Sequence, residues 1–185
     1  MSNQATQPSA VHYGASAPQQ TTDDAQTWIT RGANFVVCVS KVRAGATLQR
    51  PQQDDEYMVL LVDLPARIEA GDAHCDAAPE SLTIVPPGNS RVTALADGCI
   101  VRVFSCRAED LARAAGNAAV YASGAPEVAP LVPWPDPVGG YALRNYVLAD
   151  HIQAGTNMRI FRSTNLMLNI MTPRMVARDV HKLSP

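Results

Sequence analysis

Short runs of apolar and β-branched residues, separated by turn residues, fill the chain between about Thr27 and Ser105. Charged and apolar residues alternate in ARIEA, as in a strand with one wet face, whereas YMVLLVD at 57–63 is apolar almost throughout and suits burial on both sides. The predicted strands are TWITR, NFVVCVSKV, YMVLLVD, ARIEA, SLTIV, RVTAL and CIVRVFS. So many short strands within about 80 residues favour a sandwich or a closed barrel, and therefore an all-β fold.

The segments on either side of this run have other patterns. Residues 1–26 are rich in Gln, Ser, Thr, Ala and Pro, so they bury too little apolar surface to offset their chain entropy, and a mobile tail is expected. The segment AEDLARAAGN at 108–117 predicts one short helix, with Ser105 just upstream as its cap. Five prolines in residues 121–140 predict an extended connector, which leaves residues 27–120 for the barrel.

Composition narrows the classes of function. The chain has 185 residues, of which 46% are hydrophobic, enough for a domain with a sizeable core. Its net charge of −2 argues against a broad surface for nucleic acid or for anionic membranes. No apolar run approaches the ~20 residues of a membrane span, and the N-terminus lacks the pattern of a secretory signal. The four cysteines form no C-x-x-C pair and are expected to be reduced thiols in a cytoplasmic protein.

The stretch ESLTIVPPGNSRVTAL, from Glu80 to Leu95, consists of a strand, a Pro-Pro-Gly turn and a second strand. Proline presets the φ of such a bend and glycine supplies its positive φ. With the order of the surrounding elements, this turn resembles the second motif of the cupin superfamily, G-x5-P-x-G-x2-H-x3-N. Pro86 and Gly88 match the motif, but its histidine position is Arg91 and its opening glycine position is Glu80.

The first cupin motif, G-x5-H-x-H-x3–4-E-x6-G, is matched less completely. Gly45 stands at its opening glycine, its two histidine positions are Pro51 and Gln53, and Glu56 lies one residue short of the glutamate position. The resemblance implies a small jelly-roll β-barrel of the RmlC-like type. In the family the histidines and the glutamate hold iron, manganese, nickel or zinc, because imidazole and carboxylate suit these ions. All three imidazoles are absent here, so no metal and no other cofactor is expected in this barrel.

Three polar residues of the matched region form a candidate ligand-binding site without a metal: Gln53, Glu56 and Arg91. An arginine in the barrel mouth could pair with Glu56, or bind a carboxylate or a phosphate through two parallel hydrogen bonds. The alternative is an internal ion pair or a charge turned toward solvent. His74 is the only nearby histidine, and the sequence identifies no catalytic residue.

Residues 141–185 resemble the start of a second cupin module, as in two-barrel cupins whose first barrel is degenerate and whose second holds the metal. The segments YALRNYVL, MRIFRS and NLMLNIMTP have strand character, but so few strands cannot close a barrel. His181 has no partners at a fixed spacing. A divalent transition metal (Fe, Mn, Ni or Zn) is therefore expected only in a complete second module. Otherwise the terminal strands pack on the first barrel or pair with another subunit, most simply in a homodimer.

Three functions remain open at this point. The first is a cupin-type enzyme of small-molecule metabolism, with metal-dependent catalysis in a second module beyond this chain. The second is a non-catalytic small-molecule-binding or dimerisation barrel, with Arg91 as the anion contact. The third, a metal-free isomerase, ranks last because it needs a histidine base paired with a carboxylate, and no such pair is visible. Neither nucleic acid nor a membrane is expected as a partner.

Overall fold

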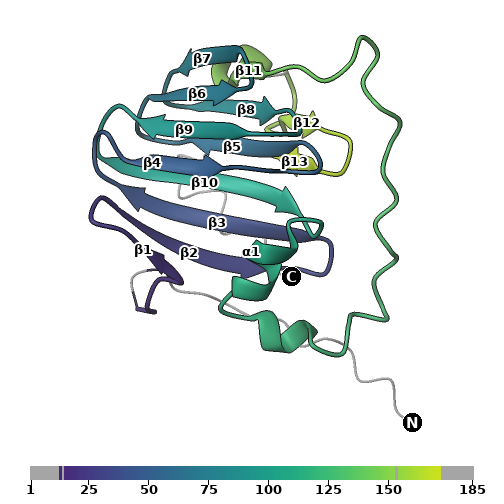
Figure 1. The fold of residues 1–185 in the computed structure, drawn as a ribbon. Coiled ribbons are helices and arrows are strands. Elements are labelled where there is room, and N and C mark those ends of the chain that lie inside the picture. The colour runs from purple at the N-terminus through teal and green to yellow at the C-terminus, as the bar shows by residue number, and fades with distance from the viewer. Residues whose placement is uncertain (1–12, 14, 153, 172–185) are drawn as a thin grey trace.

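The computed structural model describes residues 13, 15–152 and 154–171, which form an antiparallel β-barrel of two sheets (Figure 1). The larger sheet has the strand order β1 (Gln20–Thr21), β2 (Ala25–Arg31), β3 (Phe35–Val42), β10 (Gly98–Ser105), β5 (Tyr57–Leu61), β8 (Ser81–Val85) and β11 (Arg144–Val147). The smaller sheet has the order β4 (Thr47–Arg50), β9 (Ser90–Ala94), β6 (Ala66–Ala70) and β7 (Ala73–Ala77). A separate hairpin contains β12 (Ile160–Arg162) and β13 (Met167–Asn169). The predicted all-β class is confirmed.

The core of the barrel lies between the inner faces of the two sheets. Successive residues of a strand point to opposite faces, and the inner positions carry side chains such as Ile29, Val59 and Ile68, each at most 1% exposed. Tyr57 and Phe104 stack within this core, with their ring centroids 4.6 Å apart. The alternation of apolar and polar residues along the strands is therefore the alternation between this core and the outside of the barrel.

The Pro-Pro-Gly turn connects β8 to β9, as the sequence predicts. Gly88 has a φ of +108°, a conformation that residues with a Cβ rarely adopt. Its N–H donates to the carbonyl of Gln53 over 2.8 Å, and the N–H of Gln53 donates back to the Gly88 carbonyl over 3.0 Å. Glu80, at the opening glycine position of the motif, also has a positive φ, 54°. The backbone thus keeps the glycine conformation there although the residue differs.

One short α-helix, α1 (Glu109–Ala114), follows the strands of the barrel as predicted, and the 3-10 helix η1 (Ala118–Tyr121) comes after it. Leu111 of α1 packs into the barrel core. The predicted cap is wrong, because no side chain caps the first turn. The Ser105 hydroxyl donates to the buried carboxylate of Asp55 over 2.6 Å, and its oxygen accepts the backbone N–H of Arg107, ahead of the helix, over 3.2 Å. No helix of the described residues is long and apolar enough to cross a membrane.

Strands begin before residue 27, within the segment 1–26 that the sequence predicted to be a tail. β1 pairs with β2, and β2 begins at Ala25, which is buried. Farther upstream, the indole N–H of Trp28 donates to the carbonyl of Ser16 over 2.8 Å. Backbone groups make most of these contacts, and an argument from side-chain composition does not count them. Residues 1–12 and 14 lie outside the described part of the chain.

Residues 121–140 run as an extended arm along one side of the barrel, from η1 toward β11 (Figure 1). All of these residues are described, and none of them is in a strand, as expected from their prolines. The side-chain amide of Asn34 donates to the carbonyl of Ala129 over 3.0 Å, and the backbone N–H of Trp134 donates to the carbonyl of Thr164 over 2.9 Å. The arm is therefore fastened both to the barrel and to the hairpin.

The segment after the arm packs on the outside of the barrel. β11 pairs with β8 and extends the larger sheet, and the 3-10 helix η2 (Leu148–His151) follows directly. A second apolar cluster joins this segment to the outer face of the larger sheet: Met58, Leu82, Ile84, Val103, Leu148, Phe161 and Leu166. Up to residue 171 the chain thus packs on the first barrel, one of the arrangements considered from the sequence. A second module stays a prediction, and His181 lies outside the described residues.

Candidate functional site

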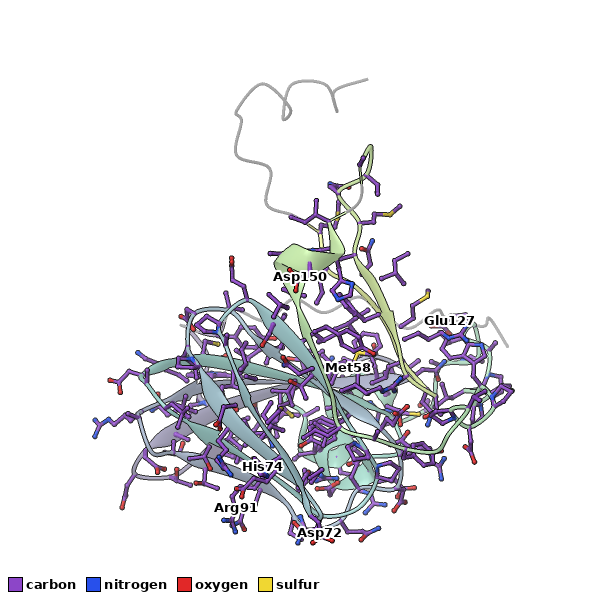
Figure 2. All side chains as sticks on the ribbon, turned by 90° about the horizontal axis from the view of Figure 1, so that it is seen from above. Met58, Asp72, His74, Arg91, Glu127 and Asp150 are labelled. Carbon is purple, nitrogen blue, oxygen red and sulfur yellow. The ribbon has the colours of Figure 1, made fainter. Side chains whose placement is uncertain are left out.

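Arg91 lies on the outer face of the smaller sheet. Its neighbours on β9, Ser90 and Val92, are buried, and Arg91 between them is exposed (Figure 2). The motif spacing suggested the barrel mouth, but the alternation of the strand turns this side chain outward. Within the described residues no ion pair includes Arg91, so the Arg91–Glu56 pair considered from the sequence does not form. The alternative, a charge turned toward solvent, describes Arg91, and His74 is likewise exposed.

Gln53 occupies a histidine position of the first motif and is 1% exposed. Its side-chain oxygen accepts hydrogen bonds from Nη2 and Nε of Arg50, over 2.8 and 3.2 Å. Its side-chain nitrogen donates to Asp55 over 2.7 Å. Arg50 in turn pairs with Asp110 over 2.6 Å, and this hydrogen bond lowers the pKa of the Asp110 carboxyl. Both ends of the Gln53 amide are therefore engaged by the chain itself.

Glu56 is completely buried and fastens the C-terminal segment to the barrel. One carboxylate oxygen accepts a hydrogen bond from Nη2 of Arg144 over 2.6 Å. The other accepts the backbone N–H of Thr164 over 2.9 Å and its hydroxyl over 3.3 Å. Asp55, next in the chain, accepts from Ser105 and from the side-chain amide of Asn165. We call this group the docking cluster; it is defined by Asp55, Glu56, Arg144, Thr164 and Asn165.

The docking cluster contains residues that the sequence reasoning missed. Arg144 meets Glu56 from 88 positions farther along the chain, and Asn165 meets Asp55 from a separation of 110. No local pattern indicates contacts at such separations. The structure brings Gln53 near Glu56 through their shared neighbour Asp55, but it gives both side chains partners within the chain rather than a free face for a ligand.

Arg102 points into the barrel and was not considered from the sequence. It lies on β10 between Ile100 and Phe104, two residues of the inner core, and is 4% exposed. Its Cα partners are Cys38 on β3 and Val59 on β5, which also belong to the inner core. The signal was present in CIVRVFS, because strict alternation places Arg102 on the same face as those two apolar residues.

The guanidinium of Arg102 has no partner of opposite charge. Its Nε is buried and makes no hydrogen bond, and no ion pair among the described residues includes it. Its Cζ lies 5.7 Å from the ring centroid of Phe104, and the Cζ of Arg50 lies 5.3 Å from the same centroid. Two guanidinium groups thus flank one aromatic ring, and only that of Arg50 is paired with a carboxylate.

Two polar groups near Arg102, the Cys38 thiol and the Tyr57 hydroxyl, are neutral near pH 7. Burial raises the pKa of the Cys38 thiol to about 11, although the nearby positive charges of Arg102 and Arg50 act in the opposite direction. Burial also raises the pKa of Tyr57, whose hydroxyl shares a hydrogen bond of 2.9 Å with Ser90. Neither group supplies a negative charge, so neither is a counter-charge for Arg102.

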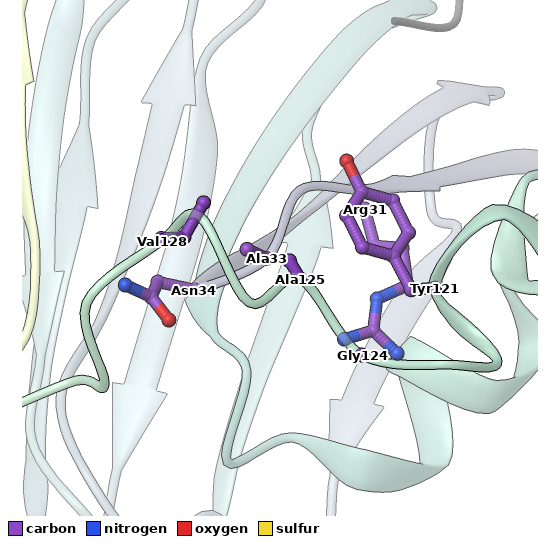
Figure 3. A pocket seen from close by; sticks show the side chains of 7 residues that line it. All are labelled: Arg31, Ala33, Asn34, Tyr121, Gly124, Ala125 and Val128. Carbon is purple, nitrogen blue, oxygen red and sulfur yellow. The ribbon is translucent and has the colours of Figure 1, made fainter. Parts of the chain in front are cut away.

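A second feature, a shallow surface pocket of about 140 Å³, lies between the β2–β3 turn and the start of the arm (Figure 3). It is lined by Arg31, Ala33, Asn34, Tyr121, Gly124, Ala125 and Val128. The Cζ of Arg31 lies 4.9 Å from the ring centroid of Tyr121, and its Nε donates to the carbonyl of Gly32 over 3.2 Å. The side chain of Asn34 bonds to the arm. The polar groups of this pocket therefore serve mainly to seat the arm.

Two facing antiparallel sheets that close around an apolar interior define a jelly-roll β-barrel. Solved structures with similar folds include KdgF from Halomonas sp., with a TM-score of 0.50 and 16% identity over 57% of this chain and 99% of that chain. A cupin superfamily protein from Desulfitobacterium hafniense has a TM-score of 0.42 and 11% identity over 46% of this chain and 81% of that chain. The protein has the cupin, or RmlC-like, fold, and the prediction made from the Pro-Pro-Gly turn is confirmed.

Other comparisons add little to this result. A mutant of Bacillus subtilis oxalate decarboxylase has a TM-score of 0.40 and 16% identity over 46% of this chain and 26% of that chain. No family model matches the chain, and no curated protein matches it by sequence. At such identities the similarity shows the fold alone, so the function has to be argued from the residues of this chain.

The residues at the metal-ligand positions of the cupin fold do not fit a metal ion. Pro51 has no donor atom in its side chain, and Arg91 faces outward. The donors of Gln53 and Glu56 are already engaged in hydrogen bonds within the chain. Over residues 13, 15–152 and 154–171, no group of three or more His, Cys, Asp or Glu side chains could hold a metal ion. The donor set of this barrel is therefore unsuited to iron, manganese, nickel or zinc.

Proposed function

We propose that this chain is a metal-free cupin barrel that binds a small molecule in its interior. The observation that carries the proposal is Arg102, a charged side chain at an inner position of the barrel, next to residues of its apolar core. A buried polar group without a partner is costly, so its presence inside the core favours a role in binding over a role in packing. The hydroxyl groups of Tyr57 and Ser90 provide further polar atoms in the same interior.

Elemental analysis of the purified protein tests the metal-free part of this proposal. Because the donor set does not fit, we expect less than about 0.1 equivalent of iron, manganese, nickel or zinc per chain after purification without chelators. A control sample is dialysed against each metal in turn and then against metal-free buffer. One equivalent of a transition metal retained by the 185-residue chain would contradict the proposal.

A second candidate function is a two-module enzyme of small-molecule metabolism, with a divalent transition metal in a second cupin module. It is supported by the described C-terminal segment, which follows a long arm and exposes several apolar side chains although it packs on the first barrel. These are Val147, Ile152, Met158, Ile160, Met167 and Met171. The test is the coding sequence downstream of Pro185. A histidine pair followed by a glutamate there would support this candidate, and an immediate stop codon would exclude it.

The same exposed residues support the proposal that the protein forms a homodimer through strand pairing. β11 is an edge strand of the larger sheet, and its Val147 is 41% exposed. A free edge beside apolar side chains favours association with a second strand. Sedimentation velocity of the full chain should show a dimer that Val147→Lys weakens. A wild-type monomer at micromolar concentration would contradict this proposal.

We also propose a cytoplasmic location and no partnership with nucleic acid or a membrane. The formal net charge of −2 offers no electrostatic attraction to polyanions as a whole. In the described chain the cysteines, Cys38, Cys75, Cys99 and Cys106, are all free thiols. Free thiols are typical of a reducing compartment. Localisation of a fluorescently tagged chain would test the first proposal. Retention of the chain on heparin at low salt would contradict the second.

A further inference from the structure

We infer that Arg102 is an anion-binding residue, and that the small molecule taken by the barrel is a small carboxylate. The inference rests on the proposed binding function and names the chemical class of its ligand. It assigns to the inner face of β10 the role that the sequence suggested for Arg91, which the structure places on the outer face of β9.

The first step is the burial of the charge. An arginine keeps its proton in a protein, so Arg102 carries a full positive charge at 4% exposure. Its Nε is both buried and without a hydrogen-bond partner. The Phe104 ring, 5.7 Å from Cζ, provides only a partial compensation. A group with these properties is stabilised strongly when an anion arrives, because the anion satisfies the charge and the N–H donor together.

The second step is the lack of a counter-charge for Arg102. Arg50, the other guanidinium beside Phe104, is paired with Asp110 over 2.6 Å and bonded to Gln53. The Cys38 thiol and the Tyr57 hydroxyl are neutral, since burial raises the pKa of each. The buried carboxylates of Asp55 and Glu56 have their own hydrogen-bond partners in the docking cluster and form no ion pair with Arg102. A ligand carboxylate would supply the missing partner.

The third step is the shape of the group and of its surroundings. A guanidinium presents N–H donors in a planar fork that matches the two oxygens of a carboxylate. The neighbouring inner positions are Cys38, Val59, Ile100 and Phe104, which offer the rest of the ligand an apolar environment. A small carboxylate with an apolar remainder therefore matches the charge of Arg102 and the apolar character of its neighbours.

The experiment uses sodium acetate and sodium benzoate as probes, with acetamide and benzamide as neutral matches. Ionic strength is held constant with sodium chloride. The proteins are the full wild-type chain, Arg102→Gln, and Arg91→Gln, which makes the same change of charge on the outer face of the barrel. Binding is measured by the thermal shift and by the Nε–Hε NMR signal of Arg102. That signal is assigned by its absence from the spectrum of Arg102→Lys. This variant also retains the positive charge, and it replaces Arg102→Gln in the comparison if Arg102→Gln does not fold.

The expected result is that at least one carboxylate stabilises the wild type and Arg91→Gln, and moves the Arg102 Nε–Hε signal. The Kd in Arg102→Gln should be at least tenfold weaker, and the amides should have no effect. Equal binding by all three proteins, or saturation without movement of the Arg102 signal, would overturn the inference. The inference would also be overturned if neither acetate nor benzoate bound the wild type at 50 mM. Binding of a neutral molecule alone would overturn the inference but leave the proposed binding function intact, whereas a stoichiometric metal would overturn the function itself.

Discussion

Two regions of this barrel bury charged side chains, and they satisfy them in opposite ways. In the docking cluster, both carboxylate oxygens of Glu56 are bonded to Arg144 and Thr164, which belong to the C-terminal segment. On the inner face of β10, Arg102 has no counter-charge among the described residues, whereas Arg144, whose Nε is likewise buried and unbonded, pairs with Glu56. Burial alone does not separate structural from functional charges; the state of the partners does. The chain satisfies the buried charge of Glu56 itself, which fits a structural role, whereas the missing counter-charge of Arg102 is the basis of the proposed ligand site.

The largest effect is expected from Glu56→Ala. The change removes a buried carboxylate, leaves Arg144 unpaired and deprives Thr164 of its acceptor. Breaking a buried pair typically costs about 3–5 kcal/mol; we expect about 3 kcal/mol here because the Arg144 side chain keeps 32% exposure. The free energy of unfolding is measured by urea titration, and hydrogen exchange of the β12–β13 hairpin should rise.

The matched control for Glu56→Ala is Glu109→Ala. It breaks the pair between Glu109 and Arg113 on the surface of α1, where both side chains are well exposed. Such a pair contributes about 0.5 kcal/mol or less. If the two substitutions destabilised the protein equally, the docking cluster would not differ from an ordinary surface ion pair, and the comparison between the two regions would fail.

A smaller effect of the opposite sign is expected from Arg102→Met. Methionine keeps the length of the side chain and removes an unpaired buried charge, so the ligand-free protein should become more stable by about 1 kcal/mol. Urea titration without added carboxylate measures this gain. A loss of more than about 2 kcal/mol would show that Arg102 is satisfied within the chain, and it would move Arg102 into the same category as Glu56.

The smallest effect is expected from Asp110→Asn at the outer end of the Arg50–Gln53 network. The side chain of Asp110 is 63% exposed, so its pair with Arg50 should contribute no more than about 0.5 kcal/mol at neutral pH. The Arg50 hydrogen bond lowers the pKa of Asp110 in the folded state. The contribution is therefore complete above the ordinary carboxyl pKa of about 4 and is lost as the pH falls through the lowered value.

Urea titrations of both proteins between pH 7 and pH 2 measure this dependence. The difference in unfolding free energy between wild type and Asp110→Asn should be constant near neutrality and should shrink in acid. A difference that grew as the pH fell would have the wrong sign for a carboxyl whose pKa is lowered by folding. It would also imply that Arg50 is not neutralised by Asp110, which would change the count of charges around Phe104.

The strands, the turn and the short helix could be predicted because their signals are local. The alternation in ARIEA and the proline and glycine of the turn act within a few residues, and the cupin fold followed from them. The docking cluster could not be predicted, since Arg144 and Glu56 are 88 residues apart and only the packing of the outer segment brings them together. The early start of β2 was missed because backbone pairing with β1 leaves no trace in composition.

The two arginines show where the motif spacing and the structure differ about the barrel interior. The spacing of a motif placed Arg91 in the barrel mouth, whereas strand alternation placed it outside between two buried neighbours. The same alternation, applied to β10, places Arg102 inside. Position relative to a turn identifies which residue occupies a family's ligand position, but it does not guarantee where that side chain points. In a β-barrel the period of two is the stronger guide to which charges face the interior.

The extended arm of residues 121–140 makes the C-terminal segment a tethered ligand of its own barrel. β11 on β8 and the hairpin over Met58 are contacts that a separate peptide could also make, and the arm raises their effective concentration without taking part in them. Proteolysis of the arm would leave two fragments held together by the docking cluster and the outer apolar cluster. The barrel is in this sense one partner of a complementing pair, and a linker of about twenty residues joins it covalently to the other partner.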